Sequence, residues 1–400
     1  MSQWQERESR VYMTTGRRTP LTIVRGEGLR VWDDSGNEYL DYVGGWAVDT
    51  LGHCHPTIVR ALEEQGKTLL QTSNQFYTIP QVLLAELLTE NSCMSRVYVC
   101  NSGAEANEGS VKLARKYGRL NRNGAYEIIT ALNSFHGRTL AMVSATGQPS
   151  HQDAFQPIPE GFVNVPYDDI EAIKAATRDK TCAVMLEMLQ GEAGVVVPDG
   201  DYLRQVRQWC DQQGLLLILD EIQTGIGRLG TLFGYEQTGI EPDIMSLAKG
   251  LGGGVPIGAF LAKEEAAVFT PGDHGSTYGG NALTCAVAHA VVSHVINEHV
   301  LENVRVQGQR LSQGLERLQA EFPFIAEVRG EGLLIGVQFT KEVAAELLMA
   351  SLREGLLLNS PRPNVLRFMP PLVISEAEVD EGLDKFRGAL TTVGRDQDLV

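Results

Sequence analysis

An unbroken run of five aliphatic residues at 215–219 (LLLIL) constrains the fold of this chain more than any other feature. Such a run is typical of a strand that is covered on both faces, as the central strands of parallel sheets are. Strand-like and helix-like segments alternate on both sides of it along the chain. This alternation predicts an α/β fold with a mostly parallel sheet and helices on both of its faces.

The alternating region extends from about residue 53 to residue 300. Apolar runs bounded by turn signals predict its strands, and apolar residues at helical spacing predict its helices. The expected strands are 97–100, 127–131, 142–145, 182–187, 215–220, 244–247 and 257–262, and the expected helices include 104–120, 201–213 and 282–300.

Two shorter regions flank the alternating one. Residues 1–52 are predicted to form a small β-meander, and residues 301–400 an α+β region that ends in a helix with a capping box of Ser375 and Glu378. Because so small a meander cannot bury a core alone, we expect it to pack with the C-terminal region. We predict a large domain at 53–300 and a small α+β domain made of 1–52 and 301–400. The expected strands of the small domain are 21–24, 30–33, 39–43, 326–328, 333–339 and 365–368.

The charge and the cysteines narrow the function classes. A formal net charge of -16 argues against nucleic acid or an anionic membrane as a partner. No apolar run approaches the length of a membrane span, and the first residues are polar, so we expect a cytoplasmic protein. The six cysteines show no CxxC spacing. We therefore expect neither structural disulfides nor a metal site.

Asp220 and Lys249 predict the chemistry of the protein. Asp220 ends the predicted central strand, and ligands of α/β sheets collect beyond such strand ends. Lys249 has small neighbours, and burial would make its amine a nucleophile near neutral pH. A buried aspartate needs a cationic partner, which a protonated pyridine nitrogen can supply. The pair predicts pyridoxal 5′-phosphate (PLP), although an aspartate that caps a helix and a surface lysine remain alternatives.

Two segments are candidates for binding a phosphate. Ser102, Gly103 and Ala104 open a predicted helix directly after a strand, and helix N-termini present free amides and a partial positive charge. An ordinary N-cap at Ser102 is the alternative. Ser276 and Thr277 carry hydroxyl groups between glycines and form a weaker candidate.

Aromatic and charged residues follow other strands at the same predicted edge. Phe135 or His136 can stack on a flat ring, and Arg138 can bind a carboxylate through two hydrogen bonds. Glu192 follows the predicted strand at 182–187. Arg367 lies within an apolar strand and must be paired if it is buried, with Glu192, a substrate carboxylate or a structural partner as candidates.

Eight segments occur in one order between about residues 12 and 375: GHCHP, NSGAEANE, SFHGRT, QGEAGV, LILDEIQTGIGRLG, LAKGLGGGVPIGA, HGSTYGGN and NVLRF. In this order they resemble the subgroup-III (class-III) ω-aminotransferases, and within them the acetylornithine aminotransferases. The resemblance implies a PLP-dependent transferase of fold type I that forms a homodimer with active sites at the subunit interface.

The resemblance also implies roles for individual residues. Lys249 would bind the cofactor and move the proton, Asp220 would pair with the pyridine nitrogen, and Gln223 would approach the ring hydroxyl. Phe135 would stack on the ring. The phosphate would be held by Ser102, Gly103 and Ala104, together with Thr277 of the other subunit.

By the same resemblance, Arg367 and Arg138 would bind the two carboxylates of 2-oxoglutarate, and Glu192 would mask Arg367 while the donor is bound. The implied reaction moves the terminal amino group of an N-acylated diamino acid, such as N-acetylornithine, to 2-oxoglutarate. Ornithine, 4-aminobutyrate and aminoadipate-semialdehyde-type reactions of lysine biosynthesis are the alternatives. Trp46 and Ser276 are further candidate substrate contacts. Trp46 and the residues at 15–18, which include Arg17, depart from the family pattern.

Overall fold

The computed structural model describes residues 2–16 and 18–399 of the chain. Arg17, part of the predicted departure at 15–18, lies outside the described residues. None of the described helices has the length and apolar character that a membrane span requires.

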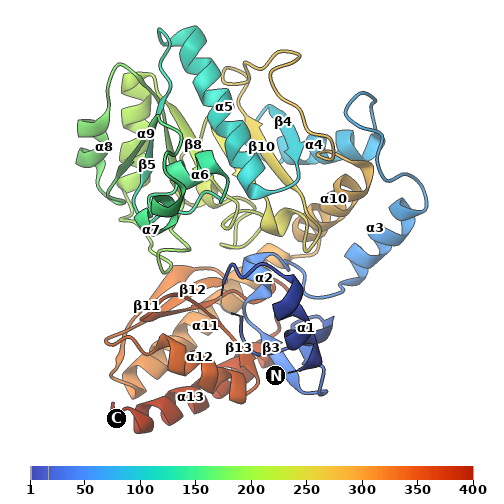
Figure 1. Cartoon of the computed structure of the whole chain (residues 1–400), viewed down its shortest axis with the longest axis vertical. Coiled ribbons are helices and arrows are strands. Elements are labelled where there is room, and N and C mark those ends of the chain that lie inside the picture. The colour runs from blue at the N-terminus through green and yellow to red at the C-terminus, as the bar shows by residue number, and fades with distance from the viewer. Residues whose placement is uncertain (1, 17, 400) are drawn as a thin grey trace.

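The larger sheet has seven strands in the order β4-β10-β9-β8-β7-β5-β6, with β8 in the middle. The strands from β9 to β6 pair in parallel, whereas β10 is antiparallel to both β9 and β4. The predicted α/β fold with a mostly parallel sheet is therefore confirmed (Figure 1). The strands are β4 (Arg96–Cys100), β5 (Glu127–Ala131), β6 (Phe162–Val165), β7 (Thr181–Glu187), β8 (Leu216–Asp220), β9 (Ile244–Leu247) and β10 (Gly258–Ala262).

Successive side chains of β8 pack into different layers of the fold. Leu217 and Leu219 belong to a buried cluster with residues of α9 and α10, whereas Leu216 and Ile218 belong to a cluster with residues of α5 and α6. Because alternate side chains of a strand point to opposite faces, a strand covered on both sides is apolar at every position. The helices around this sheet are α3 (Pro56–Gly66), α4 (Ile79–Glu90), α5 (Gly103–Asn121), α6 (Leu140–Ala145), α7 (Pro149–Gln152), α8 (Ile170–Ala176), α9 (Tyr202–Gln213) and α10 (Ala282–Asn297), with 3-10 turns at η1 (Asp153–Phe155), η2 (Gly234–Gln237) and η3 (Lys249–Leu251).

The prediction of a strand at 142–145 is wrong, because these residues form most of helix α6. Met142 and Ala145 are three residues apart, and both pack into the cluster that also contains residues of α5. The place beside β5 is taken by β6, a strand that the prediction omitted. A short apolar run does not by itself distinguish a strand from a buried helix.

Two four-stranded sheets lie below the larger one in Figure 1. The N-terminal sheet has the order β1-β2-β3-β13, and its last strand comes from the C-terminal region and pairs in parallel with β3. The other sheet has the order β11-β12-β15-β14. The strands are β1 (Ile23–Glu27), β2 (Arg30–Asp33), β3 (Glu38–Asp41), β11 (Ile325–Glu331), β12 (Leu334–Phe339), β13 (Leu356–Leu357), β14 (Asn359–Arg362) and β15 (Val365–Phe368).

The two ends of the chain also meet through side chains and single backbone bonds. The Met369 amide donates to the Tyr42 carbonyl at 2.8 Å, and the Tyr42 hydroxyl donates to the Glu378 carbonyl at 3.0 Å. Ser375 and Glu378 form the predicted capping box at the start of the last helix. The helices of this part are α2 (Gly44–Ala47), α11 (Val300–Glu321), α12 (Ala344–Arg353) and α13 (Glu376–Asp396).

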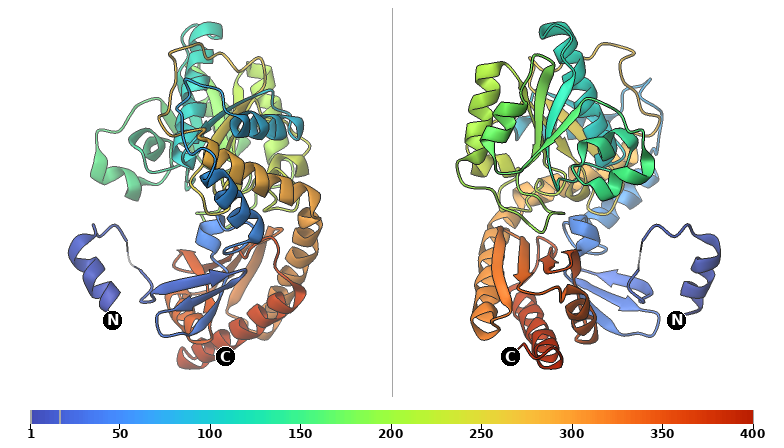
Figure 2. Two further views of the ribbon diagram at one scale, coloured as in Figure 1. Left: turned by 90° about the vertical axis from the view of Figure 1, so that its right-hand side faces the viewer. Right: turned by 60° about the vertical axis from the view of Figure 1, so that its left-hand side comes forward.

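The first helix, α1 (Gln3–Val11), was not predicted. It has no buried residue and stands apart from the rest of the chain in both views of Figure 2. Its sequence, QWQERESRV, lacks the apolar stripe by which a packed helix is recognised.

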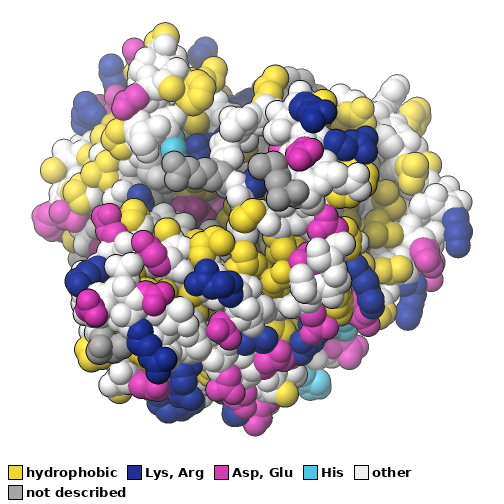
Figure 3. Space-filling view, turned by 60° about the horizontal axis from the view of Figure 1, so that its bottom comes forward, with side chains coloured by type: hydrophobic (Ala, Val, Ile, Leu, Met, Phe, Trp, Pro, Cys, Tyr) yellow, Lys and Arg dark blue, Asp and Glu magenta, His cyan; other side chains and the backbone are white. Residues whose placement is uncertain are grey.

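On the face that Figure 3 shows, acidic and basic side chains are interspersed and hydrophobic side chains gather near the middle.

Candidate active site

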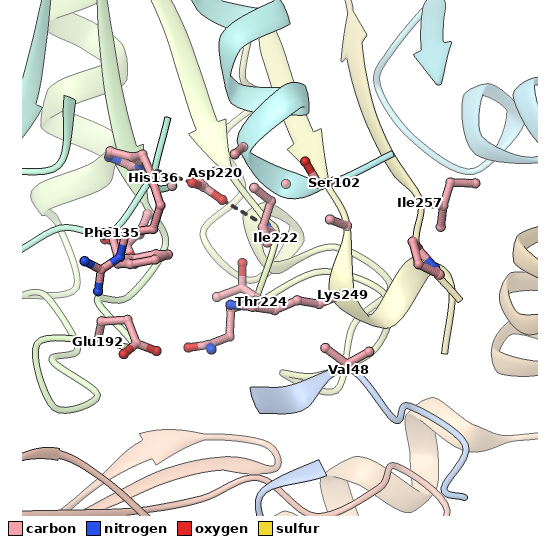
Figure 4. Close-up of a pocket in the computed structure, with 18 of the residues that line it drawn as sticks. Val48, Ser102, Phe135, His136, Glu192, Asp220, Ile222, Thr224, Lys249 and Ile257 are labelled. Atoms are coloured by element: carbon pink, nitrogen blue, oxygen red, sulfur yellow. Dashed lines mark hydrogen bonds and ion pairs between the residues drawn. The ribbon is translucent and has the colours of Figure 1, made fainter. Parts of the chain in front are cut away.

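The carboxyl ends of five strands of the larger sheet, β4, β5, β7, β8 and β9, lead into one cavity of about 460 Å³. The cavity lies at the edge of the sheet that faces the two smaller sheets (Figure 4). Ligands of α/β folds bind at this edge because the strands end there and the following loops carry the polar groups. The predicted site residues that line the cavity are Ser102, Gly103, Ala104, Phe135, His136, Arg138, Glu192, Asp220, Gln223 and Lys249.

Asp220 is a buried carboxylate that is held on both of its oxygens. Asn107 donates to Oδ2 from Nδ2 at 2.7 Å, and Nδ1 of His136 lies 2.8 Å from the same oxygen. The amide of Ile222 donates to Oδ1 at 3.0 Å. These contacts fix the carboxylate at the top of the cavity in Figure 4 and make Asp220 a fixed negative group for a cationic ligand atom.

Asn107 was not predicted as a site residue. It lies four residues after Gly103 in α5, so both residues fall on the same side of the helix. Its amide also donates to the His136 carbonyl at 2.8 Å, and therefore ties the loop after β5 to Asp220. An asparagine inside an otherwise buried helix face was the only sequence signal for this role.

Lys249 comes two residues after β9 and begins the turn η3. Its backbone has a φ of 34°, in the left-handed region that residues other than glycine rarely occupy. Burial lowers the pKa of the Lys249 ammonium below its usual value; the Glu192 carboxylate opposes this shift, and the Arg367 guanidinium adds to it. The amine is therefore more readily available as a nucleophile than that of a surface lysine.

The N-terminus of α5 forms another part of the cavity wall. Ser102 caps the helix, and its hydroxyl accepts from the Glu105 amide at 3.3 Å. A Cβ atom added to Gly103 would lie 2.8 Å from Cδ1 of Ile222, so a side chain at this position would require Ile222 to move. The helix continues for 19 residues, and its free amides and dipole favour an anion at this end.

The loop after β5 carries an aromatic ring and an arginine into the same cavity. The Phe135 amide donates to Oε2 of Glu187 at 3.2 Å, and the guanidinium carbon of Arg138 lies 5.4 Å from the centre of the Phe135 ring. Arg138 has no carboxylate within salt-bridge distance among the described residues. Its positive charge is therefore available to an anionic ligand.

Arg367 is paired with Glu192, the first of its three predicted partners. Its side chain is fully buried on β15, and Nη1 lies 2.8 Å from Oε1 of Glu192. The guanidinium also donates to Asn359 at 2.9 Å and to Gln223 at 3.3 Å. Burial alone would raise the pKa of Glu192, but the charges of Arg367 and Lys249 hold it below its usual value.

Glu187, at the end of β7, is a cavity residue that the prediction passed over. It pairs in register with Asp220 on the neighbouring strand. Burial raises the pKa of Glu187 well above its usual value, and the charge of Asp220 raises it further. The sequence signal that could have identified it is an acidic residue at the end of an apolar strand, since the neighbouring strand β8 also ends in an acidic residue.

Four predicted residues do not line the cavity. Ser276 contacts its wall indirectly, because its hydroxyl accepts from Nδ2 of Asn101 at 3.1 Å. Thr277 accepts at its carbonyl from the side chain of Gln71. Trp46 is 58% exposed and lies two residues before Val48, which does line the cavity. A fourth residue, Arg367, lies behind Glu192 rather than at the cavity surface.

The residues of the cavity fit the predicted cofactor. Asp220 suits a protonated ring nitrogen, the N-terminus of α5 suits a phosphate, and Lys249 suits an aldehyde. Nε2 of Gln223 is buried without a partner among the described residues and can donate to a ring oxygen. The donors and acceptors at these positions match the groups of PLP, whereas the cavity wall offers no set of His and Cys ligands for a metal.

Comparison with known proteins gives a consistent result. The family model described as aminotransferase class-III matches residues 11–390. An acetylornithine aminotransferase of Caldanaerobacter subterraneus is 50% identical over 387 residues, which cover 96% of this chain and 98% of that protein.

Solved structures of similar proteins share the fold. The ornithine aminotransferase of Toxoplasma gondii, in a structure described as having partial occupancy of PLP at the active site, matches with a TM-score of 0.95 and 33% identity, over 99% of this chain and 95% of that chain. The N-acetylornithine aminotransferase of Stenotrophomonas maltophilia matches with a TM-score of 0.84 and 38% identity, over 97% of this chain and 99% of that chain.

Proposed function

The chain belongs to the class-III aminotransferases, which are PLP-dependent enzymes, and from this premise we propose that it transfers the terminal amino group of an N-acylated diamino acid to 2-oxoglutarate. N-acetylornithine is the first candidate donor, and the products are the corresponding semialdehyde and glutamate. The observation that carries the proposal is that Asp220 and Lys249 face one cavity from the ends of two adjacent strands, β8 and β9.

PLP, when bound, supplies an aldehyde that accepts the amino group and a pyridine ring that takes up electron density. Asp220 would keep a proton on the ring nitrogen, because Asn107 and His136 hold its carboxylate in place. Ser102 and the following amides of α5 would hold the phosphate, and Phe135 would cover one face of the ring.

Lys249 would act both as the nucleophile toward the cofactor and as the group that moves a proton on the substrate. Its lowered pKa supports both tasks, because a neutral amine can attack a carbonyl carbon and can accept a proton. The position of the residue in a tight turn directly after β9 restricts where the amine can reach.

Two substrates of different charge must use the same cavity in turn. While the donor is bound, Glu192 would stay on Arg367, and the α-carboxylate of the donor would bind Arg138. The two carboxylates of 2-oxoglutarate would then bind Arg367 and Arg138, with Glu192 displaced. The 2.8 Å contact between Glu192 and Arg367 supports this exchange, since a single pair at the cavity edge can open without loss of the fold.

A panel of donors tests the proposed function. The protein is loaded with PLP and mixed with 2-oxoglutarate and N-acetylornithine, ornithine, 4-aminobutyrate or an aminoadipate-type donor, and the glutamate formed is measured. We expect N-acetylornithine to give a higher kcat/KM than the unacylated donors. Ornithine is the second candidate because of the similarity to the Toxoplasma gondii enzyme. Glutamate formation from none of the four would contradict the proposal.

We also propose that the chain forms a homodimer. Large apolar side chains are exposed in one short segment, with Tyr77 99% exposed, Ile79 76%, Phe76 60% and Leu70 53%. Contiguous exposed apolar surface is typical of an interface. Thr277, which lies outside the cavity of its own chain, would then reach the phosphate of the other subunit. Sedimentation velocity should give twice the mass of one chain.

The division into a large domain at 53–300 and a small domain made of 1–52 and 301–400 is a further part of the proposal. The pairing of β13 with β3 supports it, because the two ends of the chain share a sheet. Such a division would place Glu192 and Arg367 on different domains, so that movement of one domain against the other would change their distance.

A further inference from the structure

Arg228 is a buried arginine on the loop that follows β8, and it has no carboxylate partner among the described residues. Its Nη1 donates to two backbone carbonyls, that of Leu333 at 3.0 Å and that of Pro370 at 2.6 Å. Burial lowers the pKa of the Arg228 guanidinium to about 9, so the group is still charged at neutral pH. A buried charge without a charged partner is costly, and an apolar side chain can fill such a place at a lower cost. Stability alone therefore does not explain this arginine.

The two carbonyls belong to the strands of one C-terminal sheet. Leu333 lies in the turn before β12, and Pro370 follows the end of β15 by two residues; β12 and β15 pair with each other. The contact with the turn is reciprocal, because the Leu333 amide donates to the Arg228 carbonyl at 3.1 Å. A Cβ atom added to Gly332 would lie 2.6 Å from that carbonyl oxygen, so the two backbones approach closely. Arg228 therefore joins the loop after β8 to both strands.

Other arginines also join this sheet to the loops around the cavity, but they are partly exposed. Arg329 donates to the Gly194 carbonyl at 2.8 Å, and Arg362, at the mouth of the cavity, donates to Oδ1 of Asn133 at 3.2 Å. Arg228 differs in being buried and in reaching the opposite way, from the loop after β8 to the sheet.

The segments that Arg228 joins meet a second time inside the site. Arg367 lies on β15, three residues before Pro370, and its guanidinium donates at 3.3 Å to Gln223, which lies five residues before Arg228. The bond from Arg228 to Pro370 is the shorter of the two contacts. Nη2 of Arg367 is buried without a partner among the described residues and can donate to a carboxylate. The place of that donor depends on where Arg228 holds β15.

We propose that Arg228 is a positioning residue for the acceptor substrate, because its bonds fix β15, and with it the Arg367 guanidinium, relative to the cofactor-binding end of β8. The inference rests on the proposed function, in which 2-oxoglutarate binds Arg367, whereas Glu192 covers Arg367 while the donor is bound. Loss of Arg228 then weakens the binding of 2-oxoglutarate and spares the donor. A role in stability alone affects both substrates alike.

Arg228→Met tests the inference, since methionine fills the place without a charge or a donor. In the PLP-loaded variant we expect kcat/KM for 2-oxoglutarate to fall about tenfold, because a displaced guanidinium loses charge-assisted hydrogen bonds, and kcat/KM for N-acetylornithine to stay within about twofold. Calorimetry with glutarate, a dicarboxylate that cannot accept an amino group, gives a second measurement. Its dissociation constant should rise by the same factor as kcat/KM for 2-oxoglutarate falls.

The matched control is Arg305→Met. Arg305, on α11, also donates to a carbonyl of the loop after β8, that of Gly230 at 2.6 Å, but it is exposed and does not contact β15 through this bond. Its variant should keep both values of kcat/KM. PLP absorbance and the unfolding temperature of each variant report on the cofactor site and the fold.

Arg228→Lys should show a smaller loss of the same kind, since one positively charged donor remains, and it decides the question if the methionine variant does not fold. An unaltered kcat/KM for 2-oxoglutarate, or an equal loss for both substrates, overturns this inference alone. If the unaltered enzyme forms no glutamate from N-acetylornithine and 2-oxoglutarate, the proposed function fails as well.

Discussion

The two sides of the cavity are built in different ways. On the side of the larger sheet, the Asp220 carboxylate is held by Asn107, His136 and Ile222. These three residues lie in α5, in the loop after β5 and directly after β8. At the mouth, Arg138 and Arg362 have no acidic partner among the described residues, and Arg367 depends on the single carboxylate of Glu192.

The difference follows from what each side has to bind. The cofactor stays in place through the reaction, so its partners can be fixed before it arrives, and fixed partners cost no reorganisation during the chemistry. In the proposed function the two substrates alternate and carry different charges, so their partners would have to become free and be masked again. A buried guanidinium such as that of Arg367, with one carboxylate that can move away, suits this task, whereas a carboxylate held on both oxygens, such as that of Asp220, does not.

The largest effect is expected on the side of the larger sheet, which is called the fixed side here because its residues are held in place before the cofactor binds. Lys249→Ala removes the amine at the cofactor position, and we expect glutamate formation to fall by about 10⁴-fold or more, because both a nucleophile and a proton-transfer group are lost. Glutamate release is measured for both proteins. In the unaltered protein, borohydride reduction and mass spectrometry should locate the bound PLP at position 249.

The control for this variant is Lys180→Ala, which removes an exposed lysine and should retain full turnover. The unfolding temperature of Lys249→Ala shows whether the change in the strained turn affects folding. Near-normal turnover of Lys249→Ala, or a trapped adduct on another lysine, would contradict the assignment.

A smaller effect is expected at the mouth. Glu192→Gln leaves Arg367 without a charged partner, and the guanidinium becomes open to any carboxylate that enters. With glutamate and N-acetylornithine compared as amino donors, we expect the ratio of kcat/KM for glutamate to that for N-acetylornithine to rise about tenfold. Glutamate would no longer have to displace Glu192 from Arg367, and one charge-assisted contact is worth about 1.4 kcal/mol. PLP absorbance should stay the same, since Glu192 does not hold Asp220. An unaltered donor ratio would show that Glu192 is not the mask.

The sequence predicted the fold where a pattern was local and long. The run at 215–219 and the alternation around it identified β8 and the parallel sheet, and the capping box of Ser375 and Glu378 identified the start of α13. The strand at 142–145 was wrong because four apolar or small residues fit a buried helix equally well. The helix α1 was missed because it buries no residue and so carries no apolar stripe.

The candidate site could be predicted in part for the same reason. Asp220 and Lys249 stand next to features of their own segments, a buried strand and a run of small residues. Asn107 and Arg362 form hydrogen bonds with residues that are 113 and 229 positions away, and a single sequence carries no sign of such pairings. These pairings became visible only when the fold brought the segments together.

The smallest effect is expected at Glu187, a second carboxyl group on the fixed side that can be compared with Asp220. Glu187 pairs in register with Asp220, and burial raises the pKa of Glu187 well above its usual value, so the carboxyl group keeps its proton to a higher pH in the folded protein than in the unfolded chain. Between the unfolded pKa, near 4.5, and the raised folded pKa, the folded state binds more protons than the unfolded state. The free energy of unfolding therefore falls as pH rises through this window, by up to about 1.4 kcal/mol per pH unit.

Glu187→Gln has no such proton to lose and still offers an oxygen to the Phe135 amide. We expect its unfolding temperature, relative to that of the unaltered protein, to rise as the pH increases above about 4.5, the unfolded pKa of this carboxyl group. Glu342→Gln, at an exposed position, should show no such trend. A difference for Glu187→Gln that stays constant with pH would mean that this carboxyl is already ionised in the folded protein. In that case the fixed side would hold two negative charges, on Glu187 and Asp220, at the ends of neighbouring strands.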